Sequence, residues 1–410
     1  MVPKGWMLKQ LSDIVKEKIS YGIVQAGPHI PNGIPYIKSS DIRGAIDPAS
    51  LQRTAPEIHY KYRRSAVHPG DIIFSLRGNI GETAIVPSNL LEANLTQGTA
   101  RISVSGDQCN EFYHQQFAMD KLRNYINSLS KGSTFKEISL EELREVKVLC
   151  APLPEQKKIA QILSTWDKAI TVTEKLLVNS QQQKKALMQQ LLTGKKRLLD
   201  ENGVRFSTEW EFKRISEIAT RVQRKNDAAE HPILTISSLS GFVRQDERYS
   251  RYMAGESVKN YILLKKGEFA YNKGNSKTYE FGCIFDLEAY EAGLVPHVYV
   301  CFRLKNGLSH RYFKYLFEAD YLKPQLGALV NTGVRNNGLL NIKPTEFMQT
   351  KVPVPCFEEQ ESIADMLYNS SRTIRVLQDK LACLKDEKKA LMQQLLTGKR
   401  RVKVDEAVAV

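Results

Sequence analysis

The sequence predicts an α+β protein in which two mixed α/β domains alternate with two long helices. We expect the helices to pair antiparallel as a coiled-coil spacer, and an internal duplication to relate the halves by a pseudo-two-fold. Three observations predict this fold. A twelve-residue string occurs twice, two long segments lack glycine and proline, and the stretches before them mix strand-like runs with Gly, Pro and Asn breaks. The length of 410 residues also exceeds that of one ordinary domain.

The duplication is the most specific of these observations. Residues 184–195 read KKALMQQLLTGK, and residues 388–399 repeat the string 204 positions later. The same offset links Trp6 to Trp210 and Glu155-Gln156 to Glu359-Gln360. Between these points the offset drifts, because Gly70 corresponds best to Gly267, 197 positions on. Two copies of one module, with loops that have diverged, account for this pattern.

The second part of each module is expected to be helical. Residues 155–193 and 358–397 contain no glycine or proline. Pro154 suits a first helical turn, and Gly194 and Gly398 suit the left-handed residue that ends a helix. Apolar residues recur at heptad spacing, more weakly in the first helix, and antiparallel pairing would bury both seams. The alternative is that each helix packs on its own domain or on another protein.

The first part of each module contains the strand-like runs 71–75, 83–86 and 297–302. These runs predict the two α/β domains. The expected boundaries are residues 1–151 for the first domain, 152–198 for the first spacer helix, 199–354 for the second domain, 355–402 for the second helix and 403–410 for a tail.

Charge narrows the class of partner. The net charge is +14, from 59 Lys and Arg against 45 Asp and Glu, which favours a polyanion. Nucleic acid fits better than a membrane surface, because neither end carries a basic amphipathic helix with a strong apolar face. No apolar run approaches the length of a membrane span, and the first ten residues do not resemble a secretory signal. We therefore expect a cytoplasmic protein with no membrane partner.

Three motifs occur in the same order in both modules. They are a Pro-rich turn ending in Glu-Gln (residues 152–156 and 353–360), a long helix ending in LLTGK, and a strand and turn at residues 69–78. This duplicated order closely resembles the specificity subunits of type I restriction-modification systems, over essentially the whole chain. One departure is Lys266-Gly-Glu268, which replaces Pro69-Gly-Asp71 and puts the shape of that loop in doubt.

The resemblance implies that each globular part is a target recognition domain that reads one half of a bipartite site in double-stranded DNA. It also implies that the helices are a spacer and dock two adenine methyltransferase subunits, and that further restriction subunits translocate and cut DNA. S-adenosylmethionine, ATP and Mg²⁺ are then expected in those partner subunits, and no cofactor in this chain.

Catalytic motifs are not found. No phosphate-binding loop occurs, because Gln189 stands where such a loop before Gly194-Lys195 needs its leading glycine. The six cysteines and seven histidines show no metal-ligand spacing. We therefore predict a non-catalytic subunit without a metal. The alternatives are a free-standing bipartite DNA-binding protein and, less favoured, a nuclease or methyltransferase with an unrecognised active site.

Candidate DNA-binding residues are polar or basic side chains in loops that follow strands, since bases are read by amide and guanidinium groups and phosphates are held by cations. For any one of them an ordinary solvated loop is the competing interpretation. The first domain offers Arg77 and Asn79 for bases, Lys61, Arg63 and Arg64 for phosphates, and Lys131, Ser133 and Thr134 as a second region. The second domain offers Asn272, Lys273, Asn275 and Lys277, with Thr332, Arg335 and Asn336 as its second region.

Overall fold

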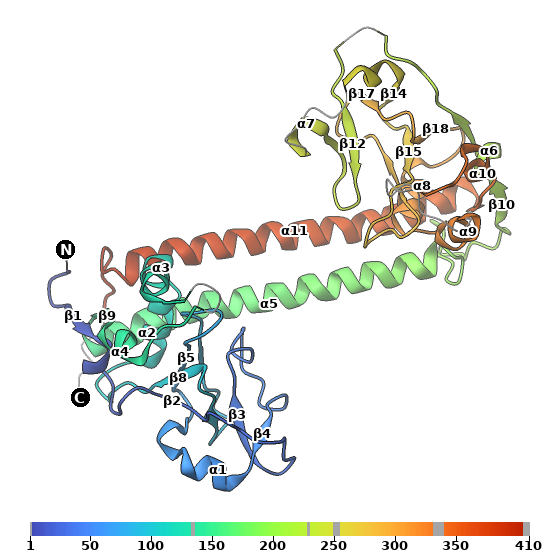
Figure 1. Ribbon diagram of the computed structural model, residues 1–410. Coiled ribbons are helices and arrows are strands. Elements are labelled where there is room, and N and C mark those ends of the chain that lie inside the picture. Colours follow the sequence, from blue (N-terminus) through green and yellow to red (C-terminus); the bar gives the residue numbers. More distant parts are fainter. Residues whose placement is uncertain (1, 133–135, 228–229, 249–254, 331–339, 405–410) are drawn as a thin grey trace. The chain divides into compact units, whose positions relative to one another are not determined.

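A computed structural model describes residues 2–132, 136–227, 230–248, 255–330 and 340–404. The chain forms two compact units, one from residues 1–174 and 379–410, the other from residues 175–378. Each unit contains one α/β domain and one half of each long helix (Figure 1). The α+β fold predicted from the sequence is confirmed.

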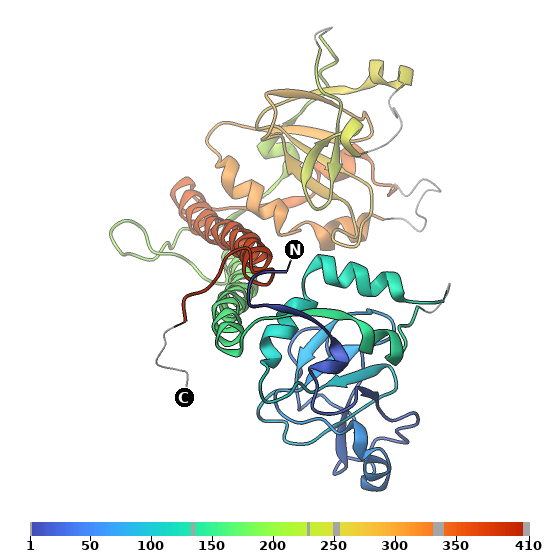
Figure 2. The same ribbon diagram turned by 90° about the vertical axis from the view of Figure 1, so that its left-hand side faces the viewer.

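The two long helices are α5 (Leu153–Leu191) and α11 (Phe357–Leu395), each of 39 residues. At 1.5 Å per residue each is about 58 Å long. Within each unit a half of α5 lies beside a half of α11 and runs in the opposite direction (Figures 1 and 2). In the first unit, for example, the Trp166 indole N–H donates to Glu387 at 3.3 Å. The antiparallel pairing predicted from the heptad seam is therefore present.

Both helices end seven residues before the predicted spacer segments do, and the two ends have the same geometry. Gly194 and Gly398 have φ values of 70° and 66°, so the helical path stops there. The N–H of Gly194 donates to the Leu191 carbonyl at 3.3 Å, and the N–H of Gly398 donates to the Leu395 carbonyl at 3.2 Å. The repeated LLTGK motif is therefore a helix terminator.

The first domain combines small sheets with short helices. Its strands are β1 (Met7–Gln10), β2 (Ser20–Tyr21), β3 (Ile34–Ile37), β4 (Arg53–Thr54), β5 (Ile72–Ser75), β6 (Thr83–Ile85), β7 (Asn94–Leu95), β8 (Thr99–Ile102) and β9 (Lys147–Cys150). Its helices are η1 (Leu11–Asp13), α1 (Pro56–Lys61), η2 (Arg63–Ser65), α2 (Asn110–Phe117), α3 (Asp120–Leu129) and α4 (Leu140–Glu145).

The second domain has a related set of elements. Its strands are β10 (Glu211–Arg214), β11 (Ala219–Arg221), β12 (Leu234–Ser237), β13 (Gly241–Arg244), β14 (Ile262–Lys265), β15 (Phe269–Asn272), β16 (Cys283–Asp286), β17 (Ala292–Val295), β18 (Val300–Leu304) and β19 (Lys351–Val354). Its helices are α6 (Ile215–Ile218), α7 (Gln245–Arg248), η3 (Gly255–Asn260), α8 (His310–Glu318), α9 (Lys323–Leu329) and α10 (Pro344–Met348).

A four-stranded antiparallel sheet is common to both domains. Its strand order is β2-β8-β5-β6 in the first domain and β11-β18-β15-β16 in the second. The registers correspond, with Ile72 opposite Ile102 and Phe269 opposite Phe302. The two-stranded sheets β1-β9 and β10-β19 also correspond. The other sheets differ, since the first domain adds β4-β3-β7 and the second adds the pairs β12-β13 and β14-β17. One scaffold thus supports two different surfaces.

A triad of Trp, Glu and Arg closes each unit at the same place. In the second unit, Trp210 donates to Glu359 at 2.8 Å, and the Arg197 guanidinium binds that carboxylate through two N–H groups at 2.5 and 2.7 Å. In the first unit, Trp6 donates to Glu155 at 3.4 Å, and Arg401 binds Glu155 through two N–H groups. The carboxylate raises the pKa of each arginine by hydrogen bonding. All three positions keep the offset of 204.

The glutamine after each of these glutamates caps another helix. The side-chain oxygen of Gln156 accepts the backbone N–H of Cys109, next to α2, at 2.9 Å. The side-chain oxygen of Gln360 accepts the backbone N–H of Ser309, next to α8, also at 2.9 Å. The Glu-Gln motif therefore fixes each domain to the start of its long helix. We call these paired triads and glutamines the frame.

The end of each long helix is buried in the unit of the other module. Leu395 of α11 and the following Leu396 belong to the core of the first unit, together with Phe112. Leu191 of α5 and the following Leu192 belong to a core of the second unit. Because burial of a leucine side chain contributes about 2 kcal/mol, these ends are an integral part of each core.

Candidate nucleic-acid interface

The first domain brings its two predicted loop regions together. Arg77 follows β5, and its guanidinium forms an ion pair with Glu137 at 2.8 Å. Lys131 and Glu137 exchange two backbone hydrogen bonds at 2.9 and 3.0 Å. The Lys131 ammonium lies 2.9 Å from Glu142, and this hydrogen bond raises the pKa of Lys131. Arg77 and Lys131 therefore belong to one polar surface, and both remain accessible to solvent.

Asn79 lies in the same loop as Arg77. It is exposed, and its amide N–H donates to Glu82 at 3.2 Å. Its amide oxygen remains available to a partner, since a side-chain amide carries both a donor and an acceptor. Ser133 and Thr134 lie outside the described residues.

The second domain has the corresponding loop after β15. The Asn272 side chain folds back on this loop and accepts the N–H of Gly274 at 3.0 Å. The Lys273 ammonium donates to the Ile342 carbonyl at 2.8 Å. Asn275 and Lys277 are exposed. Of the four predicted residues, these last two present their side chains to solvent, whereas Asn272 and Lys273 hold the loop. Thr332, Arg335 and Asn336 lie outside the described residues.

Lys61, Arg63 and Arg64 are exposed on α1 and η2. This segment is held by buried His59, whose ring bonds to Glu92 at 3.0 Å and to Asn94 at 3.2 Å. The Asn94 amide donates to Nδ1, so Nε2–H is the ring donor to Glu92. Arg64 lines a cleft in the first unit, and none of the lining residues belongs to the loops of Arg77 or Lys131.

We call this hollow the arginine cleft. Its volume is about 510 Å³, and it is lined by Glu17, Lys18, Ser20, Tyr21, Arg64, Arg101, Leu140 and Arg144. Sequence reasoning found Arg64 but missed Arg101 and Arg144. The available signal was Arg101 itself, a charged residue between apolar neighbours in the strand-like run Thr99–Ile102, where a buried guanidinium needs nearby acceptors.

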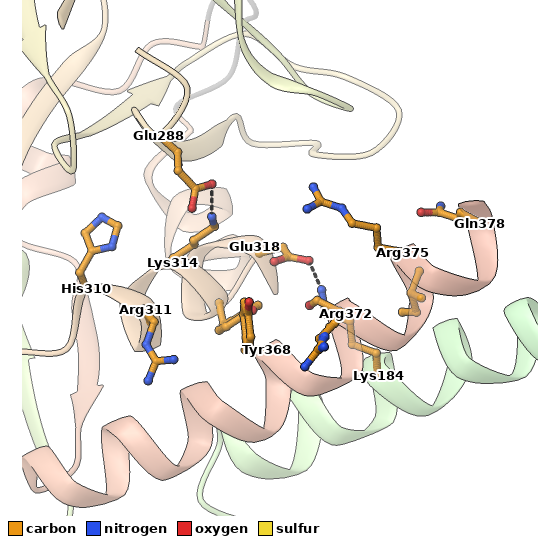
Figure 3. A pocket seen from close by; sticks show the side chains of 13 residues that line it. Lys184, Glu288, His310, Arg311, Lys314, Glu318, Tyr368, Arg372, Arg375 and Gln378 are labelled. Atoms are coloured by element: carbon orange, nitrogen blue, oxygen red, sulfur yellow. Dashed lines mark hydrogen bonds and ion pairs between the residues drawn. The ribbon is translucent and has the colours of Figure 1, made fainter. Parts of the chain in front are cut away.

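A second cleft, of about 630 Å³, lies in the second unit between α8 and the long helices (Figure 3). Ion pairs cross it. Lys184 of α5 lies 2.6 Å from Glu318 of α8, and Arg311 of α8 lies 2.7 Å from Glu361 of α11. Lys314 binds Glu288 at 2.5 Å. The first two pairs join the domain to the long helices, and the third lies within the domain.

The polar junction in the first unit uses different residues. Asp167 of α5 accepts from Gln115 of α2 at 2.7 Å and from Lys388 of α11 at 2.6 Å. Lys388 therefore has a carboxylate partner on the neighbouring helix. Both units thus fix the domain on the helices by buried or half-buried polar contacts.

Within the described residues, no group of three or more His, Cys, Asp or Glu side chains is arranged to hold a metal ion. In the same residues, no helix is both long and apolar enough to cross a membrane.

Comparisons with known proteins agree with this architecture. Residues 3–179 match the family described as Type I restriction modification DNA specificity domain. The MjaVIII specificity subunit of a type I restriction enzyme from Methanocaldococcus jannaschii is 23% identical over 428 residues, which cover 98% of this chain and 94% of that protein. The EcoBI specificity subunit from Escherichia coli is 28% identical over 165 residues, covering 39% of this chain and 35% of that protein.

Solved structures show the same fold. The S subunit of a type I restriction-modification system from M. genitalium aligns with a TM-score of 0.58 at 13% identity and covers 96% of this chain and 99% of its own. A chain from a structural study of complex assembly and conformational transition of the type I system aligns with a TM-score of 0.56 at 14% identity, covering 98% of this chain and all of its own.

Two related domains joined to a pair of long helices are the architecture of a DNA specificity component. Residues 3–179 match the DNA specificity domain of type I restriction-modification systems, and over 98% of its length the chain is similar to a specificity subunit of such a system. It is the DNA specificity subunit of the complex and is itself non-catalytic. The resemblance inferred from the sequence motifs is confirmed.

Proposed function

We propose that this subunit reads a bipartite site in double-stranded DNA, with one domain on each half and the paired helices between them. The observation that carries the proposal is the frame. Its triads keep the offset of 204 and the same contacts, whereas the sheets and loops beside them differ. A constant frame with two different polar surfaces suits one protein that must read two different half-sites.

The frame also supports two equivalent docking positions for a repeated partner. Leu8 and Phe212 are 204 positions apart, and 50% and 61% of their surfaces are exposed. Val172 and Val376, also 204 apart, are 55% and 57% exposed. Exposed apolar side chains at matching places favour one partner bound twice.

That partner is, in our proposal, an adenine methyltransferase subunit that binds S-adenosylmethionine. Restriction subunits that use ATP and Mg²⁺ join the same complex, which acts in the cytoplasm, where the DNA lies. This chain supplies recognition and binds none of these cofactors.

Selection of bound sequences from a randomised duplex library tests the division of labour. Arg77→Ala should relax or weaken one half-site, and Lys277→Ala should affect only the other, because the two side chains belong to different domains. A lost base contact is worth about 1–3 kcal/mol. Lys121→Ala, an exposed change on α3, is the matched control and should leave both halves unchanged. Loss of both half-sites in either single variant would contradict two independent readers.

A free-standing DNA-binding protein is the competing function. Co-expression with a type I methyltransferase from the neighbouring genes separates the two. Our proposal expects two methyltransferase copies per chain in the purified complex, and a weaker complex for the Leu8→Glu and Phe212→Glu variants. A chain that selects DNA but retains no such partner would favour the competing function.

A further inference from the structure

We propose that the arginine cleft of the first unit binds a phosphate group, and that this phosphate belongs to the backbone of the DNA held by the first domain. The DNA source rests on the proposed function above. The phosphate site itself rests on the geometry of the cleft alone.

The first argument is charge. Four cations, Lys18, Arg64, Arg101 and Arg144, line the cleft with one acid, Glu17. Glu17 is paired with Arg101. Within the described part of the chain, Lys18, Arg64 and Arg144 have no carboxylate at ion-pair distance. Three uncompensated cations around one hollow produce a strong positive potential, which suits an anion.

The second argument is that a guanidinium is built into the wall. Arg101 is only 4% exposed, and β8 carries it opposite Ser20 of β2. Its side chain donates to the backbone carbonyls of Ala66 and Arg64, so its position is fixed. Lys18, Arg64 and Arg144 line the same cleft as this fixed cation, and an anion that enters would reduce the repulsion between the four positive charges.

The third argument is an unsatisfied donor. Arg144 of α4 donates one terminal N–H to the Ile19 carbonyl at 2.5 Å, whereas its buried Nε–H has no acceptor among the residues that the structure describes. A buried donor without a partner costs about 1–3 kcal/mol. A phosphate oxygen in the cleft would supply that acceptor, and guanidinium groups bind phosphate through paired N–H donors.

The fourth argument is that, at the described positions of the second domain that correspond to Arg101 and Arg144, no arginine is present. Arg101 lies opposite Ile73 in the common sheet, and Cys301 lies opposite Ala270 at the corresponding place. The N–H of Leu11 donates to Val146 in the first unit, and that of Ile215 donates to Thr350 in the second. This match places Met348 where the first unit has Arg144. The cleft is therefore a feature of the first domain and not of the scaffold that the two domains share.

The cleft has room for more than a single phosphate group. Its volume of about 510 Å³ would also take part of an adjoining sugar. Tyr21, 39% exposed, is one of the lining residues, and its aromatic ring is a side chain on which a sugar can pack. These features fit a phosphodiester whose chain continues out of the cleft.

A double variant, Lys18→Gln with Arg64→Gln, tests the proposal. Neither side chain has a hydrogen bond or ion pair to another of the described residues, so the variant should fold. Lys16→Gln with Lys121→Gln removes the same charge from exposed positions outside the cleft and is the matched control. Each protein is titrated, as the full chain, with the duplex that the wild-type chain selects and with duplexes carrying one neutral methylphosphonate at successive backbone positions.

We expect a methylphosphonate at one position, or at either of two adjacent positions, to weaken DNA binding by the wild-type and control proteins about tenfold, since a hydrogen-bonded charge pair is lost. The cleft variant should bind the unmodified duplex about tenfold more weakly and should show less than a twofold further loss at those same positions. Its slope of log affinity against log salt should fall by about one. A cleft variant that keeps the wild-type loss at every position would overturn the assignment to a backbone phosphate.

Pyrophosphate binding to the chain without DNA, measured by calorimetry, separates the two sources of phosphate. Binding that is at least fivefold weaker in the cleft variant than in the control supports a phosphate site. The cleft variant could show this loss of pyrophosphate binding and still lose as much affinity as wild type at every methylphosphonate position. In that case the occupant is a free phosphate compound, and the DNA source is wrong. If neither assay distinguishes variant from control, the site does not exist. Should the wild-type chain select no bipartite DNA, the proposed function fails and the pyrophosphate assay still tests the cleft.

Discussion

Arg401 and Glu155, 246 positions apart in the chain, form a two-point ion pair between the segment after α11 and the first turn of α5. Arg401 also donates to the Lys4 carbonyl at 2.7 Å. Arg197 and Glu359 repeat the pair in the second unit. Each domain is therefore closed by residues that follow the long helix of the other module, and the two closures can be compared by mutation.

Arg197→Ala should destabilise the second unit more than Arg401→Ala destabilises the first. The side chain of Glu359 is fully buried, whereas that of Glu155 is 11% exposed and Arg401 itself is 42% exposed. Leaving the Glu359 carboxylate without its guanidinium should cost about 2–4 kcal/mol. Hydrogen exchange of each unit measures this, with Arg400→Ala as the control. Equal loss of protection in both variants would contradict the ranking.

Gly398→Ala should be more harmful than Gly194→Ala, although both glycines have positive φ. The left-handed conformation costs a side chain about 1 kcal/mol in either case. At Gly398 the new Cβ would also lie 2.4 Å from a ring carbon of Pro3, whereas at Gly194 it would meet Trp210 at an ordinary 3.5 Å. Thermal unfolding of both variants should show the larger shift for Gly398→Ala, and the reverse order would show that Pro3 does not confine the turn.

Asp320→Asn should stabilise the second unit at pH 7.5 and not at pH 4. Burial raises the Asp320 pKa to about 6. The positive charge of Lys323 opposes this rise, and the negative charge of Glu280 adds to it. The folded state therefore binds this proton more tightly than the unfolded state, and stability is lost as the pH rises from about 4 to 6. Asparagine removes the charge and tolerates the φ of 55° found here.

The expected gain for Asp320→Asn at pH 7.5 is at most about 3 kcal/mol. Urea unfolding at the two pH values measures it, and Asp379→Asn, an exposed change on α11, is the control. A gain that is the same at both pH values would assign the effect to the backbone and not to the carboxyl group.

Inserting four residues in each long helix, after Ser180 and after Leu384, should lengthen the preferred gap between half-sites by one to three base pairs. One added turn extends a helix by about 6 Å, close to two base-pair steps of about 3.4 Å. Four residues overshoot a turn by about 40°, and two base pairs twist by about 70°, which leaves about 30° for the DNA and the seam to absorb.

Selection from a library with randomised gaps would measure the change, and the two half-site sequences should be retained. An unchanged gap, with folding and affinity intact, would mean that the helices do not set the spacing.

The tryptophans, glutamates and glutamines of the frame were predictable from sequence as equivalent positions, because they perform the same task twice, whereas the contacts of Arg197 and Arg401 were not predicted. The offset of 204 predicts that Trp210, Glu359 and Gly398 occupy positions equivalent to Trp6, Glu155 and Gly194. The heptad seam predicted the antiparallel helices for a similar reason, since one apolar face recurs at a fixed spacing.

The candidate DNA surfaces were less predictable. Arg77 and Lys131 were selected separately, and nothing in their local sequence indicates that Glu137 joins them. Arg101 and Arg144 converge only because β2 and α4 place Ser20 and Leu140 beside them, which depends on strand order and helix packing. Such contacts between distant segments leave no periodic signal along the chain.

The burial of Leu395 and Leu396 in the first unit has a consequence for synthesis on the ribosome. The second unit is one continuous stretch, residues 175–378, so it has all of its core residues as soon as that stretch has emerged. The first unit, although translated first, lacks part of its core until residues 392–396 follow. The earliest domain to be made is therefore the last that can finish folding, and a chain cut short before α11 ends would leave its first reader incomplete.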